Sequence, residues 1–173
     1  KEIERSFGAD FYGNMPKLFA DDTEQIAKEL EIELEVHRQN KSDKNIIDWV
    51  LCGGISFEWA VHKLTHGSWA YRDNDIIYRL AGDKVTADGY FEYEMKVPAG
   101  DSTLWLLWGD TGEKREAYLD IDGKRQVIEA GGKKGFDWTK IPMHFDKAGV
   151  VPIRITKKSS LAPMVSQMKV VRK

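Results

Sequence analysis

The sequence predicts an all-β protein built as an antiparallel β-sandwich, and two observations lead to this prediction. Apolar residues alternate with charged residues over short stretches, as in GYFEYEMKV (89–97). Further stretches of this kind recur at intervals of roughly 8–15 residues, separated by glycine, proline, aspartate and asparagine. Many short strands joined by tight turns are typical of a sandwich of two antiparallel sheets.

The elements from residue 89 onward follow from these patterns one by one. Phe91, Tyr93, Met95 and Val97 share one face of the first clear strand. TLWLLW (103–108) is continuously apolar, which predicts a central strand covered on both faces. Asp122-Gly123 predicts a hairpin between EAYLDID and KRQVIEA. The remaining predicted strands are WTKIPMHF (138–145), VVPIRIT (150–156), which Pro152 places at a sheet edge, and MVSQMKVV (164–171).

The N-terminal third gives a weaker signal. Gly8, Gly13, Asn14 and Pro16 predict an irregular segment over residues 1–21. Asp21 or Asp22 could cap a short helix, and from Leu30 the alternation LEIELEV predicts a half-buried strand over 30–36. NIIDWVLCG (45–53) predicts a second strand, and ISFEWAVHKL (55–64) fits either a strand or a short helix. We therefore expect an irregular segment, 1–21, followed by one β-sandwich domain, 22–173.

Composition excludes several classes of function. The chain has 173 residues and a net charge of −2, which gives no basic surface for nucleic acid. No apolar run approaches the roughly 20 residues of a transmembrane helix. Cys52 is the single cysteine, which excludes an internal disulfide and a multi-cysteine zinc site. The chain begins at Lys1 without methionine, so we expect a processed or trimmed product.

Catalytic and cofactor motifs are missing from the sequence. It contains no G-x-S-x-G, H-E-x-x-H, P-loop or G-x-G-x-x-G pattern. Cys52 ends an apolar stretch, which favours a buried structural thiol over a nucleophile. We expect no cofactor and assign no metal ligands, although a structural calcium ion near Asp73, Asp75 or Asp101 would be compatible with the fold.

The order of motifs from residue 66 onward resembles a known family. The motifs are HG and YRD, then GYFEYEMKVPAG, LWLLWGD, the YLDIDGK hairpin, a DW strand, and the closing pair AGVVPIRIT and MVSQMKVVR. This order resembles the galactose-binding-like (jelly-roll) β-sandwich, an accessory domain of bacterial glycoside hydrolases. Its nearest likeness is to the C-terminal sandwich of the β-L-arabinofuranosidase group, over residues 66–172. Asn74, Asp75, Ile76 and Ile77 depart from that group, which is glycine-rich at this point.

A sugar site needs a flat aromatic face to stack on the ring and fixed polar groups to bind the hydroxyls. HGSWAYRDND (66–75) supplies both within ten residues, in what we expect to be a loop. We expect Trp69, Tyr71, Arg72 and Asp73 to bind the ligand, with Trp108, Asp110 and Trp138 as secondary contacts. The alternative is that the aromatic residues lie in the core and that Arg72 pairs with Asp73 or Asp75 to fix the loop.

Three hypotheses about function follow. The first is a non-catalytic carbohydrate-binding module of a bacterial glycan-utilisation system. The resemblance implies that such a module is extracytoplasmic, at the cell surface or in the periplasm. It also implies a neighbouring catalytic domain or protein as a possible partner. The second is a structural or protein-interaction sandwich without a sugar ligand. The third, least favoured, is a hydrolase acting on glycans, which would require two carboxylates about 5–10 Å apart across a sugar.

Overall fold

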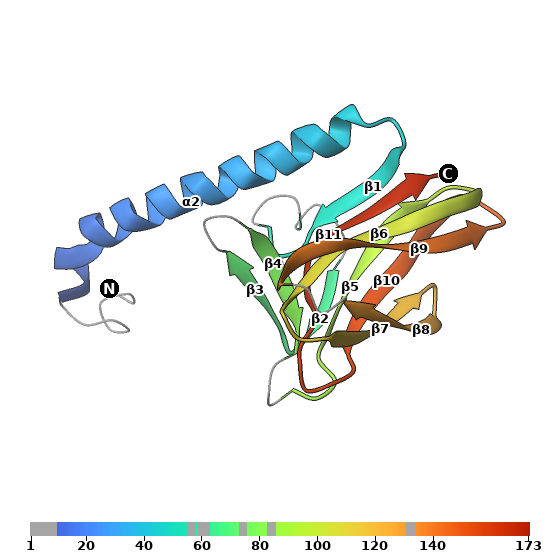
Figure 1. The fold of residues 1–173 in the computed structure, drawn as a ribbon. Coiled ribbons are helices and arrows are strands. Elements are labelled where there is room, and N and C mark those ends of the chain that lie inside the picture. Colours follow the sequence, from blue (N-terminus) through green and yellow to red (C-terminus); the bar gives the residue numbers. More distant parts are fainter. Residues whose placement is uncertain (1–9, 55–57, 59–62, 73–75, 83–85, 131–133) are drawn as a thin grey trace.

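Two antiparallel sheets packed face to face form the body of the protein. The computed structural model describes residues 10–54, 58, 63–72, 76–82, 86–130 and 134–173. One sheet has the strand order β3-β4-β11-β6-β9, with β1 also paired to β11; the other has the order β2-β5-β10-β7-β8 (Figure 1). The chain therefore has the β-sandwich fold that its alternating pattern predicts.

The described elements are α2 (Asp10–Ser42), β1 (Ile46–Leu51), β2 (Lys63–His66), β3 (Ser68–Arg72), β4 (Ile77–Ala81), β5 (Tyr90–Val97), β6 (Gly100–Thr111), β7 (Arg115–Ile121), β8 (Lys124–Ala130), β9 (Lys134–Phe145), β10 (Gly149–Lys157) and β11 (Met164–Arg172).

The core between the sheets follows the predicted alternation. Phe91, Tyr93 and Met95 on β5 are fully buried, and they pack with Leu104 and Leu106 on β6. The strand β6 has neighbours on both sides, β11 and β9, as expected for TLWLLW. Its second face is only partly covered, however, because Trp105 and Leu107 are half-buried. We call this side, turned away from the second sheet, the outer face.

The predicted hairpin joins β7 to β8. Asp122 and Gly123 have φ angles of 49° and 75°, the left-handed conformation that this two-residue turn needs. Asp122 is the only non-glycine residue with positive φ among the described residues. The Asp-Gly pair thus fixes the register from Arg115↔Ala130 to Ile121↔Lys124.

The predicted edge position of Pro152 is wrong. Its strand, β10, lies between β5 and β7. The β7 ladder ends at Ile121↔Ile153, and Pro152 lies opposite the hairpin turn, where its carbonyl accepts a hydrogen bond from the Asp122 N–H at 3.0 Å. A strand residue directs its N–H and C=O to the same side, so the missing N–H of Pro152 faces the turn beyond the ladder. Proline is tolerated there inside a sheet.

The strand expected at 30–36 is also wrong, since these residues belong to the long helix α2. Helical residues also replace the irregular segment from residue 10 to residue 21. Leucine, isoleucine and glutamate alternate over this stretch, but leucine and glutamate are strong helix formers. Only Val36 of the predicted apolar face is buried, and it packs with Leu51 and Ile77; Leu34 is exposed. In Figure 1, the N-terminal part of α2 extends beyond the sandwich.

The segment expected to be a ligand loop is mostly strand. His66 ends β2, and residues 68–72 form β3, so HGSWAYRDND is a tight connection at Gly67 followed by an edge strand. Gly67 has a φ of 54° and lies against Thr86, so a side chain would not fit. The last part, residues 73–75, lies outside the described residues.

No helix in the described part of the chain combines the length and the apolar composition that a membrane span requires.

Candidate functional site

Trp69 and Tyr71 lie two residues apart on β3 and therefore on one face of the sheet. They are 55% and 47% exposed. Tyr71 pairs with Tyr78 of β4 across the ladder, and opposed residues of antiparallel strands share a face. The neighbours of Tyr78 on β4, Ile77 and Arg79, are buried on the other face. Trp69 and Tyr71 thus belong to the outer face of the six-stranded sheet.

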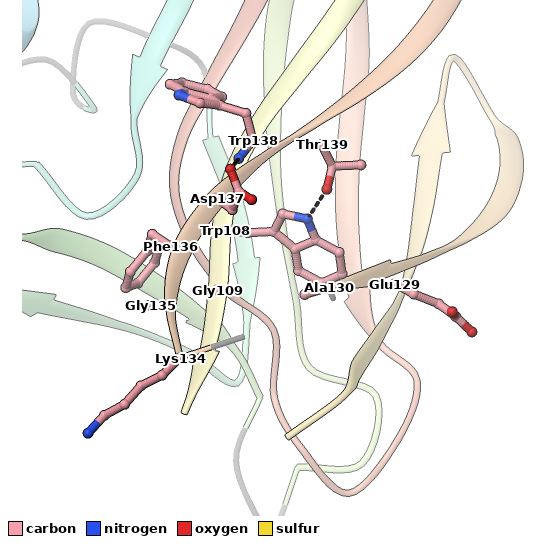
Figure 2. Close-up of a pocket in the computed structure, with 10 residues that line it drawn as sticks. All are labelled: Trp108, Gly109, Glu129, Ala130, Lys134, Gly135, Phe136, Asp137, Trp138 and Thr139. Atoms are coloured by element: carbon pink, nitrogen blue, oxygen red, sulfur yellow. Dashed lines mark hydrogen bonds between the residues drawn. The ribbon is translucent and has the colours of Figure 1, made fainter. Parts of the chain in front are cut away.

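Aromatic contacts continue across this face from β3 to β9. The rings of Tyr71 and Tyr78 are stacked, with centroids 5.4 Å apart and an interplanar angle of 8°. The Tyr78 ring lies 5.5 Å from that of Phe136 on β9. Phe136 and Trp138 alternate along β9, and Figure 2 shows both directed away from Trp108. We call Trp69, Tyr71, Tyr78, Phe136 and Trp138 the aromatic track.

A pocket of about 420 Å³ lies at the β9 end of the track. It is formed where the edge of β9 meets the end of β6 and, from the second sheet, the end of β8 (Figure 2). Its lining is mixed, with aromatic, small and charged residues: Trp108, Gly109, Glu129, Ala130, Lys134, Gly135, Phe136, Asp137, Trp138 and Thr139. Aromatic surface and charged groups therefore meet at one place.

Trp108 forms the inner wall of the pocket rather than an exposed platform. Its side chain is 1% exposed and belongs to the core. The indole Nε1 donates a hydrogen bond to Thr139 Oγ1 at 2.7 Å (Figure 2). A buried indole needs such an acceptor, so this bond fixes the ring against β9.

The charged residues of the pocket are open to solvent. Asp137 is exposed, and its Oδ1 accepts a hydrogen bond from the Trp138 N–H at 2.8 Å. Glu129 pairs with Lys114 at 2.8 Å, an exposed ion pair that stays accessible to water. Lys134 begins β9 and is exposed.

Lysines cover the two indoles beside the pocket. Lys169 Nζ lies 4.7 Å from the centre of the Trp138 ring, and Lys140 Nζ lies 3.9 Å from that of Trp105. Trp105 and Trp138 meet edge to face, 5.9 Å apart. Burial lowers the pKa of Lys169, although nearby Asp43 opposes this effect. The contacts hold Trp138 in place and leave it half-buried.

Three of the residues predicted for the site are only partly described. Asp110 pairs in the backbone with Gly135 and Lys134, which places it at the β6 end next to the pocket, but its side chain lies outside the described part of the structure. The same is true of the Arg72 side chain, and Asp73 falls in the undescribed segment 73–75. The structure thus brings Trp108 and Trp138 together in one pocket and links it to Tyr71 through Tyr78 and Phe136.

Sequence reasoning missed Tyr78, Phe136 and Asp137. Tyr78 and Phe136 are 58 positions apart, and only the strand order β4-β11-β6-β9 brings them together. The alternation along FDWTK (136–140) places Phe136 on the same face as Trp138, and this local signal could have identified Phe136.

Asp101 does not form the centre of an acidic cluster. Its carboxylate contacts His144 Nδ1 at 2.7 Å and lies 4.0 Å from Lys173 Nζ, so its described partners are basic side chains rather than carboxylates. Among the described residues, no group of three or more histidine, cysteine, aspartate or glutamate side chains could hold a metal ion. Asp73 and Asp75 lie outside those residues.

Comparisons with known proteins support the fold. The chain is similar to a family 35 carbohydrate binding module from Clostridium thermocellum, with a TM-score of 0.55 and 16% identity over 73% of this chain and 99% of that one. It is also similar to the CBM36-1 domain of a multidomain xylanase from the hindgut metagenome of Trinervitermes trinervoides (TM-score 0.55, 11% identity, 73% and 97% covered). A third similarity is to the GH26-CBM35 β-(1,4)-mannanase of Podospora anserina (TM-score 0.55, 6% identity), where 75% of this chain covers 28% of that one.

These similarities show a shared β-sandwich fold. A scan of protein-family models gives no match, and a search of curated proteins gives none either.

Proposed function

We propose that this protein is a non-catalytic carbohydrate-binding module that binds its ligand at the pocket beside β9. The observation that carries the proposal is the meeting of half-buried aromatic rings with solvent-facing charged groups at the β9 edge of the sandwich. An accessible aromatic face stacks on the C–H face of a sugar ring, and the polar groups distinguish hydroxyl positions. The fold, shared with carbohydrate-binding modules, supports the same conclusion.

Each side chain at the pocket has a role in this proposal. Trp138 and Phe136 provide the stacking surface on the outer face of β9, and Asp137 lies on the other face of the same edge strand, beside Trp108. Asp137 accepts hydrogen bonds from sugar hydroxyls, since a carboxylate accepts more than the single bond from the Trp138 N–H. Lys134, which is positively charged, donates hydrogen bonds to sugar oxygens. Trp108 supports this surface from the core.

The setting of the module belongs to the same proposal. We propose an extracytoplasmic location in a bacterial glycan-utilisation system, beside a catalytic domain or protein, and a finer likeness to the C-terminal sandwich of the β-L-arabinofuranosidase group. A carbohydrate-binding module attached to a mannanase illustrates such an arrangement in a protein of the same fold. A structural calcium ion near Asp73 and Asp75 remains a prediction, which repeating the binding assay with EDTA would test.

Native gel electrophoresis through xylan, β-1,4-mannan or β-1,3-galactan tests the binding proposal. We expect at least one polysaccharide to retard the wild-type protein, and Trp138→Ala to weaken this binding about tenfold or more by removing the stacking surface. Asp137→Asn should weaken it while leaving the fold unchanged, because the residue is exposed.

The matched control is Tyr118→Ala, which removes a ring from the second sheet, where Arg125 covers it at 4.6 Å. This variant should bind like the wild type. Circular dichroism and thermal unfolding establish that each variant is folded. If no polysaccharide and no member of a wider glycan panel binds the wild-type protein, carbohydrate binding is disproved and the structural or protein-interaction alternative is favoured.

A further inference from the structure

The aromatic track reaches far beyond the pocket. One cross-strand row on the outer face runs from Trp69 through Leu80, Met164 and Gly109 to Phe136. These residues belong to β3, β4, β11, β6 and β9, in the spatial order of the sheet. Four spacings between neighbouring strands of about 4.8 Å each give a length of about 19 Å, several times the width of one sugar ring.

The two ends of the row are aromatic, and the Tyr78 ring links them, because it stacks on Tyr71 and lies 5.5 Å from the Phe136 ring. Trp69 and Tyr71 are the exposed rings at the β3 end, and Phe136 and Trp138 stand at the β9 end. Gly109 lies next to Phe136 in the row, and the β9 backbone packs so closely against it that a Cβ would lie 2.4 Å from the Gly135 carbonyl oxygen. A ligand that runs along the outer face can thus contact a continuous line of rings from β3 to β9.

We infer that the ligand is the interior of an extended oligosaccharide chain rather than a single terminal sugar. This inference rests on the proposed function, since the pocket beside β9 serves as one subsite. Tyr71 and Tyr78, stacked at 5.4 Å, and Trp69 form the distal subsites for further sugar units of the same chain. A ligand confined to the pocket would contact neither Trp69 nor Tyr71, whereas an extended chain would contact both exposed rings.

Isothermal titration calorimetry with oligomers of increasing length tests this inference. The probes are xylose to xylohexaose, mannose to mannohexaose, and galactose with β-1,3-galacto-oligosaccharides. We expect affinity to rise at least about tenfold from the disaccharide to the longest oligomer of the series that binds. Tyr71→Ala and Trp69→Ala should each weaken binding of the longest oligomer about fivefold and leave binding of the disaccharide unchanged.

Two further variants show whether the aromatic ring of Tyr71 and the pocket subsite each contribute to binding as the inference requires. Tyr71→Phe keeps the ring and should retain wild-type affinity for the longest oligomer. Trp138→Ala should weaken binding of oligomers of every length, because it removes the pocket subsite. Equal affinity for short and long oligomers, or a Tyr71→Ala variant that binds the longest oligomer like the wild type, would overturn the extended ligand and leave the proposed function intact. A wild-type protein that binds no oligomer and no polysaccharide would overturn both.

Discussion

At the scale of single residues, the most strongly coupled group is a buried carboxylate that belongs to the fold rather than to the site. Glu58 is 1% exposed, and its two oxygens accept hydrogen bonds from Arg79 Nε and Nη2, both at 2.7 Å. The Tyr93 hydroxyl and the Gly53 N–H also donate to Glu58 Oε1. Burial alone would raise the pKa of Glu58, but the hydrogen bonds from Arg79 and Tyr93 outweigh it and lower the pKa to about 2.

A pKa this low makes Glu58 an ionised structural partner, unlike the proton-donating carboxylic acid of a glycosidase. Glu58→Gln should lower the free energy of unfolding by about 3–5 kcal/mol, because it leaves the buried Arg79 charge without a counterion. Glu129→Gln, which removes an exposed ion pair with Lys114, is the control and should cost at most about 1 kcal/mol. Urea unfolding at pH 7 measures the free energy of unfolding of both variants. An equally small loss in Glu58→Gln and Glu129→Gln would contradict a stabilising role for the buried pair.

The same pair gives stability a defined pH dependence. Glu58 has a lower pKa in the folded state, about 2, than its ordinary value of 4.5, which applies in the unfolded chain. As pH falls below 4.5 the unfolded chain binds a proton that the folded one does not, so the contribution of Glu58 to stability is lost between pH 4.5 and 2. Urea midpoints across this range should fall more steeply for the wild type than for Glu58→Gln.

At the scale of elements, a helix and a strand over residues 30–36 predict different burial for Leu34 and Val36. In a strand, Leu34 and Val36 would share one face, and their truncation would cost similar amounts. In the helix, Val36 packs against Leu51 and Ile77, whereas Leu34 is 48% exposed. Val36→Ala should therefore cost about 1–2 kcal/mol. Leu34→Ala should stay within about 0.5 kcal/mol. Thermal unfolding of the two variants compares them, and equal losses would be inconsistent with the helix.

The helix also shows where sequence patterns stop being informative. On α2, the side facing the sandwich buries Glu29, Glu33 and Asn40 together with Val36. Because polar residues occupy the contacting face, hydrophobic spacing could not reveal a helical period. On β5 and β7 the inward residues are mostly apolar and the outward residues mostly polar or charged, so alternation alone predicted these two strands.

At the scale of the whole molecule, strand order determines which residues meet. The sequence identified Trp69, Tyr71 and Trp138 as candidate ligand contacts, because residue type and position are local properties. It could not show that Tyr78 and Phe136 connect them, since β11, the last strand, inserts between β4 and β6. It also could not show that Trp108 faces the core and Trp138 the outer face. The aromatic track on β3, β4 and β9 is thus a product of topology.

The most direct test of the central claim is a ¹H–¹⁵N NMR titration of the six tryptophan indole N–H groups with the polysaccharide fragment that binds best. Binding along the outer face predicts that the indole signals of Trp138 and Trp69 shift with one saturable affinity. Trp49 lies on the same face but contacts His37 of α2, with ring centroids 5.7 Å apart, so its signal should shift less than those of Trp138 and Trp69. Signals of Trp138 and Trp69 that do not move while glycan binds would contradict a carbohydrate site on this face of the sandwich.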